Sequence, residues 1–259
     1  MNIQSKVFAA GMIVALSACG GGSSGEPQVF DVPRGSPAPT YDPASGVLFR
    51  NGVPIASRSD TVIDNSGRAS VTTNGTDIYQ ARAEVDNEVF AVLYNDFEAG
   101  QGYLLGRREV PDLPAGSASF VGGYSGLSIR TTPGTSGLSG AVTGRVRMDV
   151  DFDQMELAGR ITDRKVVTES GNEFSLPITA ADVTLRGTRL RDNGLFAGEA
   201  SGGEFIIAAS PNLTFDASRG IYEGLIGGGS GEYVAGAFSL DHRRSDGRTF
   251  EERGVFVAE

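Results

Sequence analysis

The chain has 259 residues, and its composition excludes several classes of protein before any motif is considered. It contains one Cys and one His, which excludes an intramolecular disulfide, a Cys-cluster zinc site and a multi-His metal site. With 32 acidic and 22 basic residues, the net charge of −10 argues against nucleic acid as a partner, because phosphate binding needs a basic surface. The 37 Gly residues, which follow no Gly-X-Y period, indicate many tight turns and therefore an all-β chain.

The first residues of the chain have the pattern of a secretory signal peptide. An apolar run over residues 7–16 is too short to span a bilayer. It ends in Leu16-Ser17-Ala18-Cys19, which resembles a bacterial lipobox, the motif whose Cys is acylated and becomes the first residue after cleavage. We therefore expect residues 1–18 to be a signal peptide and Cys19 to be the lipidation site; an ordinary signal with an incidental Cys is the alternative.

The segment that begins at Cys19 differs from the rest of the chain in composition. Residues 19–45 are rich in Gly, Ser and Pro, and such a composition buries too little apolar surface to offset the entropy of ordering. We predict a lipidated tether that is flexible at its Gly/Ser start and stiffer through the prolines. Gly20 stands where an Asp would indicate retention at the inner membrane, so the lipobox resemblance implies the outer membrane.

Short strands joined by tight turns are predicted after the tether. Two Asn-Gly pairs, Asn51-Gly52 and Asn74-Gly75, separate runs of period two, and Asn-Gly is the strongest short-range hairpin signal. Two prolines, Pro111 and Pro114, then mark a boundary. We therefore predict a small antiparallel β handle-like domain over residues 46–114, with very little helix in the chain as a whole.

The second half of the chain, residues 115–259, contains the clearest strand pair, Gly144–Asp153 with 154–162. Apolar and charged residues alternate along its first strand, so one face is predicted to be buried and the other solvated. About eight or nine antiparallel strands are predicted here, including Ile178–Leu190 and Phe205–Ala209, and closure into a barrel is the simplest way to remove their edges. Because the charged residues face outward, we expect a soluble barrel and not a transmembrane one. The inward residues of the first strand are Val146, Met148, Val150 and Phe152, and the outward residues are Arg147, Asp149, Asp151 and Asp153.

Motifs of this half resemble those of a known family. Ser119-Phe120-Val121-Gly122-Gly123-Tyr124-Ser125-Gly126 opens it, and Val150–Gly159 (VDFDQMELAG) forms its hairpin. Gly220-Ile221-Tyr222-Glu223-Gly224 and Glu232–Leu240 (EYVAGAFSL) end it. Together with the lipobox and the tether, they resemble the β-barrel domain of the transferrin-binding protein B family of surface lipoproteins. The resemblance covers residues 117–259, and its motifs are structural glycines and aromatics that identify no ligand contact.

The resemblance implies an eight-stranded barrel beside a small β handle, anchored by lipid and exposed on the Gram-negative outer surface by a dedicated translocator. Family members bind host transferrin, lactoferrin, complement factor H, haem carriers or other solutes. The full transferrin-binding protein has two handle–barrel lobes, whereas this chain has room for one. In size it is nearer to the factor H-binding relative and to the transferrin-binding-protein-like solute-binding proteins. No binding residue of the family matches a position of this sequence, so the ligand-binding residues are unknown.

A triplet of carboxylates on the first barrel hairpin has the spacing that begins a calcium loop. It consists of Asp149, Asp151 and Asp153. An EF-hand needs Gly at the sixth position and Glu at the twelfth, where this chain has Gln154 and Arg160. We therefore interpret the carboxylates as the solvated face of a strand and expect no metal site.

The single His, His242, follows a strand predicted to end at Asp241. We expect it to be an exposed turn residue; axial haem ligation by His242, with a Tyr as second ligand, is the alternative. No Ser lies in a Gly-x-Ser-x-Gly elbow and Cys19 is expected to be acylated, so nucleophilic catalysis has no support. The Gly-rich stretch Gly227–Gly231 is followed by no helix and is predicted to be a mobile hairpin loop that contacts a partner.

These observations predict an all-β outer-membrane surface lipoprotein that binds a protein or solute ligand, needs no cofactor and is not an enzyme. An iron-, haem- or nutrient-related ligand, passed to an outer-membrane receptor, is the expected cargo. A TonB-dependent receptor and a surface lipoprotein translocator are the expected partners. Two alternatives stay open, a structural or protective surface lipoprotein without a solute and a carrier with a small molecule inside the barrel. A carrier needs an interior cavity, whereas the family's barrels are filled by side chains.

Overall fold

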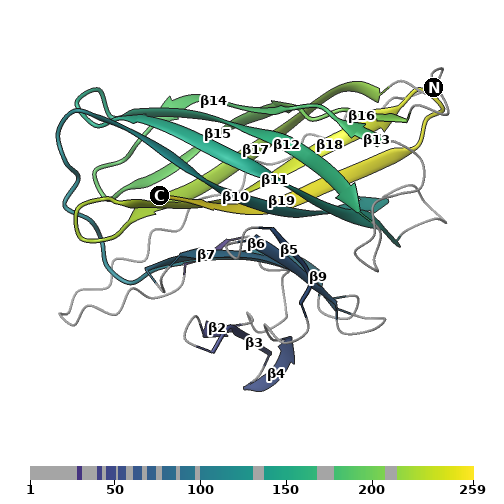
Figure 1. Ribbon diagram of the computed structural model, residues 1–259, viewed down its shortest axis with the longest axis horizontal. Coiled ribbons are helices and arrows are strands. Elements are labelled where there is room, and N and C mark those ends of the chain that lie inside the picture. The colour runs from purple at the N-terminus through teal and green to yellow at the C-terminus, as the bar shows by residue number, and fades with distance from the viewer. Residues whose placement is uncertain are drawn as a thin grey trace, which may run out of the picture.

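The protein folds into a long barrel with smaller sheets packed beneath it (Figure 1). The computed structural model describes residues 28–30, 40–42, 45–50, 52–56, 61–65, 69–73, 78–85, 88–96, 100–130, 137–167, 178–207 and 215–259, and their regular elements are all strands. The predicted fold class, a handle-like β domain followed by a closed eight-stranded antiparallel barrel, is confirmed. Within these ranges no helix is long and apolar enough to cross a membrane. The predicted signal peptide 1–18 and Cys19 lie outside the described residues.

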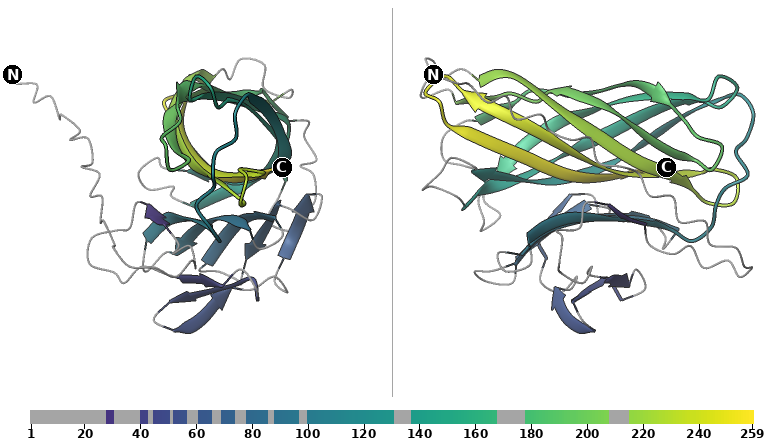
Figure 2. Two further views of the ribbon diagram at one scale, coloured as in Figure 1. Left: turned by 90° about the vertical axis from the view of Figure 1, so that its left-hand side faces the viewer. Right: turned by 180° about the vertical axis from the view of Figure 1, so that it is seen from behind.

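The barrel strands follow the order β10-β11-β12-β14-β15-β17-β18-β19, and β10 closes the ring by pairing with β19. Seen along its axis, the barrel is a complete ring with the handle sheets on one side (Figure 2). The eight strands are β10 (Ser117–Arg130), β11 (Gly137–Asp151), β12 (Glu156–Val167), β14 (Val183–Arg189), β15 (Leu195–Gly202), β17 (Phe215–Gly227), β18 (Tyr233–Arg244) and β19 (Thr249–Ala258).

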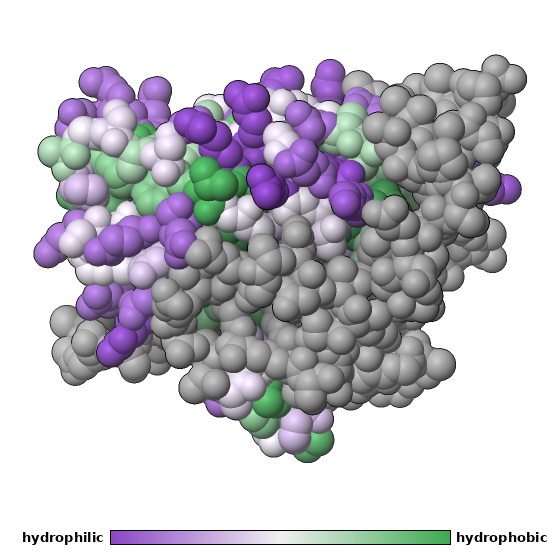
Figure 3. Space-filling model, viewed as in Figure 1, coloured by the Kyte–Doolittle hydropathy of each residue, from purple (hydrophilic) through white to green (hydrophobic). Residues whose placement is uncertain are grey.

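The predicted hairpin is the pair β11–β12, and its alternation is confirmed. Met148 and Val150 are buried inside the barrel, whereas Arg147 and Asp149 are exposed on its outer wall. A one-residue slip would bring the charged set inside, so this alternation fixes the register. Hydrophilic side chains accordingly cover much of the barrel wall seen in Figure 3.

The barrel interior is filled by its own side chains, many of them aromatic. Glycines of the family motifs make room for the rings: a Cβ on Gly236 would lie 2.3 Å from Cζ of Phe256, and a Cβ on Gly224 would lie 2.3 Å from Cζ of Phe196. Each ring therefore occupies the space that a side chain would need at the paired glycine of the neighbouring strand. The small-molecule carrier alternative, which needs an open interior, gains no support from this packing.

Two predicted barrel strands are wrong in their bounds and position. The predicted strand Ile178–Leu190 is broken into β13 (Ile178–Ala180) and β14, and Phe205–Ala209 becomes the short strand β16 (Phe205–Ile207). β13 and β16 pair with each other outside the closed ring, as a two-stranded ribbon. Between β15 and β16, Gly202 and Gly203 adopt φ angles of +88° and +81°, which interrupt the extended conformation of the strand.

The handle consists of a six-stranded sheet and a three-stranded sheet. Two of their strands fall within residues 19–45, where the sequence predicts a tether, so ordered structure begins before residue 46. The six-stranded sheet has the order β1-β9-β8-β7-β6-β5, with β1 (Gln28–Phe30), β5 (Thr61–Asn65), β6 (Ala69–Thr73), β7 (Ile78–Val85), β8 (Val89–Asp96) and β9 (Gly100–Arg107). The three-stranded sheet consists of β2 (Thr40–Asp42), β3 (Val47–Arg50) and β4 (Val53–Ala56).

β8 is buried on both faces because the handle sheet lies between two layers. Ala91 and Leu93 belong to the apolar cluster shared with the barrel. Phe90 and Val92, on the opposite face, pack with Tyr41 of the three-stranded sheet. The strand is therefore a continuous apolar run, as expected when neither face meets water.

The handle and the barrel are joined by apolar packing and by two polar anchors. Tyr103 donates from its hydroxyl to the carbonyl of Phe238 at 2.8 Å. Arg107 donates from Nη1 to the carbonyls of Asn193 at 2.7 Å and Ile226 at 2.8 Å. These hydrogen bonds and the apolar cluster shared by Ala91 and Leu93 with the barrel join the handle to the barrel.

Candidate functional site

The two ends of the barrel differ in the length of the connections between their strands. We call them the tight-turn end and the long-loop end, the latter being the end at which β13 and β16 lie in Figure 1. Turns carried by a rigid scaffold commonly hold binding residues, and the turn 245–248 together with the β13–β16 pair makes the long-loop end the candidate functional site. The described connections at the tight-turn end are 152–155, 190–194 and 228–232, and the described elements at the long-loop end are β13, β16 and the turn 245–248.

A cluster of charged side chains lies inside the barrel in the half nearer the long-loop end. Arg164 and Glu252 form an ion pair in which neither side chain is exposed to solvent. Tyr124 donates from its hydroxyl to Oε1 of Glu252 at 2.6 Å, and Nε2 of His242 lies 3.3 Å from Oε2 of the same carboxylate. We call these four residues the ionic cluster.

A bulge in β12 directs Arg164 into the barrel. Thr143 is opposite Lys165 and Arg145 is opposite Thr162, so β12 has one residue more than β11 at this point. Asp163 has a φ angle of +51°, a conformation that Asp tolerates better than most residues. The extra residue shifts the alternation, and Arg164 takes an inward position that the unbroken period would give to Asp163.

Tyr124 fits into the cluster because glycines surround its ring. A Cβ on Gly126 would lie 2.0 Å from the hydroxyl oxygen of Tyr124, and a Cβ on Gly254 would lie 2.1 Å from Cε2 of its ring. Burial and the negative charge of Glu252 raise the pKa of the Tyr124 hydroxyl well above its usual value. Tyr124 is therefore a neutral hydrogen-bond donor to the carboxylate.

Glu252 carries the negative charge of the cluster. Burial alone would raise the pKa of Glu252, but the positive charge of Arg164, together with His242 and the hydrogen bond from Tyr124, outweighs burial and lowers the pKa to about 2. The carboxylate is therefore ionised at neutral pH, and it binds partners on three other strands.

The prediction that His242 is an exposed turn residue is wrong. His242 is 1% exposed and lies inside the barrel, because β18 continues to Arg244 and places its even-numbered positions inward. Its ring is 5.2 Å from the ring of Phe205, and Nε2 faces Glu252. An axial haem ligand needs an open pocket beside its ring, and these surroundings do not fit a haem.

The carboxylates with calcium-loop spacing each have a separate structural partner. Asp149 accepts hydrogen bonds from Arg147 and Ser119, and these lower its pKa. Asp151 accepts from the N–H of Gln154 at 2.9 Å, and Asp153 accepts from the N–H of Gly116 at 2.9 Å. In the ranges that the structure describes, no group of three or more His, Cys, Asp or Glu residues could hold a metal ion.

The Gly-rich stretch Gly227–Gly231 lies at the tight-turn end and packs against the linker that joins the handle to the barrel. Gly229 accepts a hydrogen bond from the N–H of Asp112 at 3.0 Å, and a Cβ on Gly231 would lie 3.3 Å from Cδ of Pro114. Gly228 and Gly231 are buried. The stretch therefore helps to fix the linker, and the structure does not favour it as a free contact loop.

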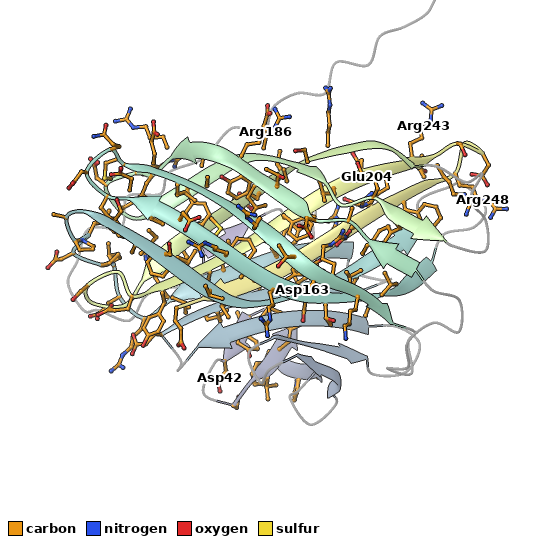
Figure 4. All side chains as sticks on the ribbon, turned by 45° about the horizontal axis from the view of Figure 1, so that its top comes forward. Asp42, Asp163, Arg186, Glu204, Arg243 and Arg248 are labelled. Atoms are coloured by element: carbon orange, nitrogen blue, oxygen red, sulfur yellow. The ribbon has the colours of Figure 1, made fainter. Side chains whose placement is uncertain are left out.

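Arginines gather on the surface of the long-loop end, although the protein as a whole is acidic. Arg243 and Arg248 are exposed, and Figure 4 shows both side chains directed away from the barrel. Arg244 and Arg248 both pair with Asp246, and Arg244 lies 5.8 Å from the ring of Phe250. This end therefore presents guanidinium groups beside aromatic surface, which suits a ligand with acidic or planar groups.

Comparison with known proteins gives similarities in structure only. No protein-family profile matches the chain, and no curated protein matches it in sequence. The solved structures that are similar include transferrin-binding protein B of Haemophilus parasuis Hp5, as a double mutant, with 17% identity over 83% of this chain and 40% of that chain, at a TM-score of 0.48. Transferrin-binding protein B, isotype 1, from serogroup B Neisseria meningitidis is similar with 19% identity over 83% of this chain and 39% of that chain, at a TM-score of 0.48.

A structure described as a surface lipoprotein is also similar, with 14% identity over 85% of this chain and 95% of that chain, at a TM-score of 0.37. The chain spans about two fifths of the length of the two transferrin-binding proteins.

Proposed function

We propose that the protein is a lipid-anchored surface lipoprotein that presents the long-loop end of its barrel to a protein or solute ligand and carries out no chemistry. The observation that supports this proposal most directly is the contrast between the two barrel ends. The tight-turn end is tied to the handle by Arg107 and to the linker by Gly229. The long-loop end has exposed arginines at the turn 245–248 and no such polar tie among the described residues.

The anchor in this proposal is the lipobox Cys, Cys19. Its N-terminal acyl groups would hold the chain at the outer membrane, since multiple acyl chains anchor far more durably than one. The first described strand, β1, begins at Gln28 and pairs with β9. About eight residues, 20–27, then separate Cys19 from β1, so this segment spans at most about 30 Å. The handle is therefore the part nearest to the membrane.

The ligand in this proposal is a nutrient-related protein or solute, with iron or haem carriers as the leading class. Two of the similar structures are named as transferrin-binding proteins, so transferrin belongs in the set of probes. Delivery to a TonB-dependent receptor, and export by a surface lipoprotein translocator, are the partner interactions that we propose. Nucleic acid is not among them, because the net charge is −10.

The test is a capture experiment with the chain from residue 20 onward, immobilised and exposed to transferrin, haem carriers and native growth medium. We expect a ligand to be retained, and we expect Arg243→Glu with Arg248→Glu to weaken retention by about tenfold or more. Arg186→Glu, on the outer wall and away from this end, is the matched control and leaves retention unchanged (Figure 4). Retention of no ligand, without a growth defect under iron starvation, would favour the structural lipoprotein instead.

The anchor is tested separately. Replacement of Cys19 by Ser in the full chain is expected to release the protein from the membrane fraction and to abolish incorporation of labelled palmitate. Continued membrane association of the Ser variant would contradict lipid anchoring at this residue.

A further inference from the structure

The β13–β16 ribbon leaves the barrel wall at two bends that lie side by side. One bend is Ala181–Asp182, between β13 and β14, and the other is Gly202–Gly203, at the end of β15. The N–H of Gly203 donates to the carbonyl of Asp182 at 2.9 Å, and the N–H of Ala181 donates to the carbonyl of Glu204 at 2.8 Å. These two hydrogen bonds link the bends to each other, and β13 also lies beside β12 of the barrel wall.

The ribbon closes the interior of the barrel with an aromatic side chain. Phe205 of β16 is 7% exposed and belongs to the apolar core of the barrel, although its strand lies outside the ring. Its ring is 5.2 Å from the ring of His242, and Cζ of Arg164 lies 5.0 Å from the centre of the same ring. Removing the ribbon would therefore expose the ionic cluster.

Arg164 connects the barrel interior to both bends. Its Nη1 donates to the carbonyl of Ala181 and, at 3.0 Å, to the carbonyl of Gly203, one residue from each bend. Its Nη2 donates to Glu252 on β19. The third nitrogen, Nε, is buried without a hydrogen-bond partner among the described residues. One guanidinium group thus holds the ribbon to the opposite wall.

We propose that the β13–β16 ribbon is a flap that opens about the bends Ala181–Asp182 and Gly202–Gly203, and that Arg164 is the latch that holds it closed. At one of the two bends, Gly202 and Gly203 have positive φ angles and can absorb the backbone rotation that a hinge requires. The ladder between β13 and β16 spans three residue pairs, so the part of the chain that moves beyond the bends is a short unit. Units with few buried contacts open locally at a small fraction of the global unfolding energy.

Opening of the flap has a direct chemical consequence for the barrel. Phe205 moves away from His242, and the carboxylate of Glu252 and the guanidinium of Arg164 meet water at the long-loop end. Hydration offsets part of the cost of losing the closed contacts, because buried charges are costly to desolvate. The barrel would then offer a polar opening at the end where its surface arginines gather.

Thiol labelling tests the proposal. In a Cys19→Ser background an introduced Cys is the sole thiol, because the chain has one Cys. Val183→Cys places the probe beside the bends, since a Cβ on Gly203 would lie 2.9 Å from the Val183 side chain. Val150→Cys is the matched probe in the other half of the barrel, and both valines are buried.

We expect the thiol at position 183 to be labelled at least about tenfold faster than that at position 150 under native conditions, because local opening exposes only the first. Arg164→Met is expected to accelerate labelling at position 183 by about tenfold more and to leave position 150 within about twofold. Equal rates at the two positions, or equal acceleration at both, would overturn the flap, because they indicate global unfolding.

Two further variants keep the test decisive if Arg164→Met does not fold. Arg164→Lys keeps the positive charge beside Glu252 but loses the planar fork that reaches two carbonyls, so labelling at position 183 should still accelerate. Gly203→Ala strains the closed bend and should do the same, whereas Gly187→Ala, where a Cβ meets open space, should not. An unchanged rate at position 183 in both Arg164→Lys and Gly203→Ala contradicts the proposal.

Discussion

The two halves of the barrel interior are filled by different chemistry, although both are closed to water. The half toward the tight-turn end is apolar, with side chains such as Phe152, Phe196 and Ile226. The half toward the long-loop end contains the ion pair of Arg164 and Glu252. Water is excluded from both, so the difference lies in how each half is stabilised.

Apolar packing and buried charge respond differently to the loss of one member. An apolar core loses stability in proportion to the surface and volume removed. A buried ion pair is stabilising only while every partner is present, because a charge left alone in the interior is strongly unfavourable. The stability of the tight-turn half therefore decreases gradually as apolar atoms are removed. The stability of the long-loop half depends on every member of the ionic cluster being present.

The largest effect is expected from an aromatic deletion in the apolar half. Phe196 is 3% exposed and lies 6.1 Å, ring centre to ring centre, from Tyr222. Phe196→Ala should lower the free energy of unfolding by about 3–5 kcal/mol, measured by urea titration, because it opens a cavity that the neighbours do not fill. Val121→Ala, at a position 49% exposed, is the control and should change it by less than about 0.5 kcal/mol. A loss below about 1 kcal/mol for Phe196→Ala would contradict the assignment of this half as the stable core.

Removal of one charge from the ionic half should be nearly as costly. Glu252→Gln leaves Arg164 buried without its counter-charge and is expected to cost about 3 kcal/mol. The double variant Glu252→Gln with Arg164→Met should be more stable than the sum of the two single effects predicts, by about 1 kcal/mol or more. Strict additivity in a double-mutant cycle would show that the pair is not coupled.

Acid should weaken the ionic half selectively. Because the pKa of Glu252 falls from 4.5 to about 2 on folding, its contribution is present above pH 4.5 and is lost as the pH decreases through about 2. The loss is expected to reach at most about 3 kcal/mol in urea titrations between about pH 5 and pH 2. Asp246, whose pKa is also lowered to about 2, contributes equally to the wild type and to Glu252→Gln. The difference between the two proteins therefore isolates Glu252, and parallel curves would exclude its role.

The smallest effect is expected on the outer wall. Nη1 of Arg186 lies 3.3 Å from Oε2 of Glu199, and the two side chains are 60% and 74% exposed. Arg186→Gln should change the free energy of unfolding by less than about 0.5 kcal/mol, because solvent screens an exposed ion pair. A loss comparable to that of Glu252→Gln would remove the distinction between interior and surface charge.

The sequence predicts the barrel because period-two alternation is a local property. Strict alternation from Val146 to Phe152 gives both the strand and its buried face, and Gly236 and Gly224 stand where aromatic rings need space. Period-two alternation in β19 also places Glu252 on the inward face, because Glu252 precedes the buried Gly254 and Phe256 by two and four residues. An inward position for Glu252 could therefore have been predicted, although its partners could not.

The inward positions of Arg164 and His242 could not be predicted from local sequence, for two different reasons. The bulge at Asp163 reverses the inward and outward positions of β12, and no residue type in the sequence requires a bulge there. β18 extends past Asp241 because β17 and β19 supply paired strands up to Arg244 and Arg243, which makes His242 an interior residue. Pairing partners distant in sequence decide such bounds.

The composition that first served to exclude functions also indicated the class of fold, because abundant glycine and alternating strands are typical of an all-β barrel. Tertiary structure alone decided which charges are brought inside, since Arg164, His242 and Glu252 come from three strands separated along the chain. The physical reason is that alternation specifies a face, whereas an ion pair requires two side chains to meet. Only the closed ring, with the bulge at Asp163 and the bends at Ala181–Asp182 and Gly202–Gly203, brings them together beneath the ribbon.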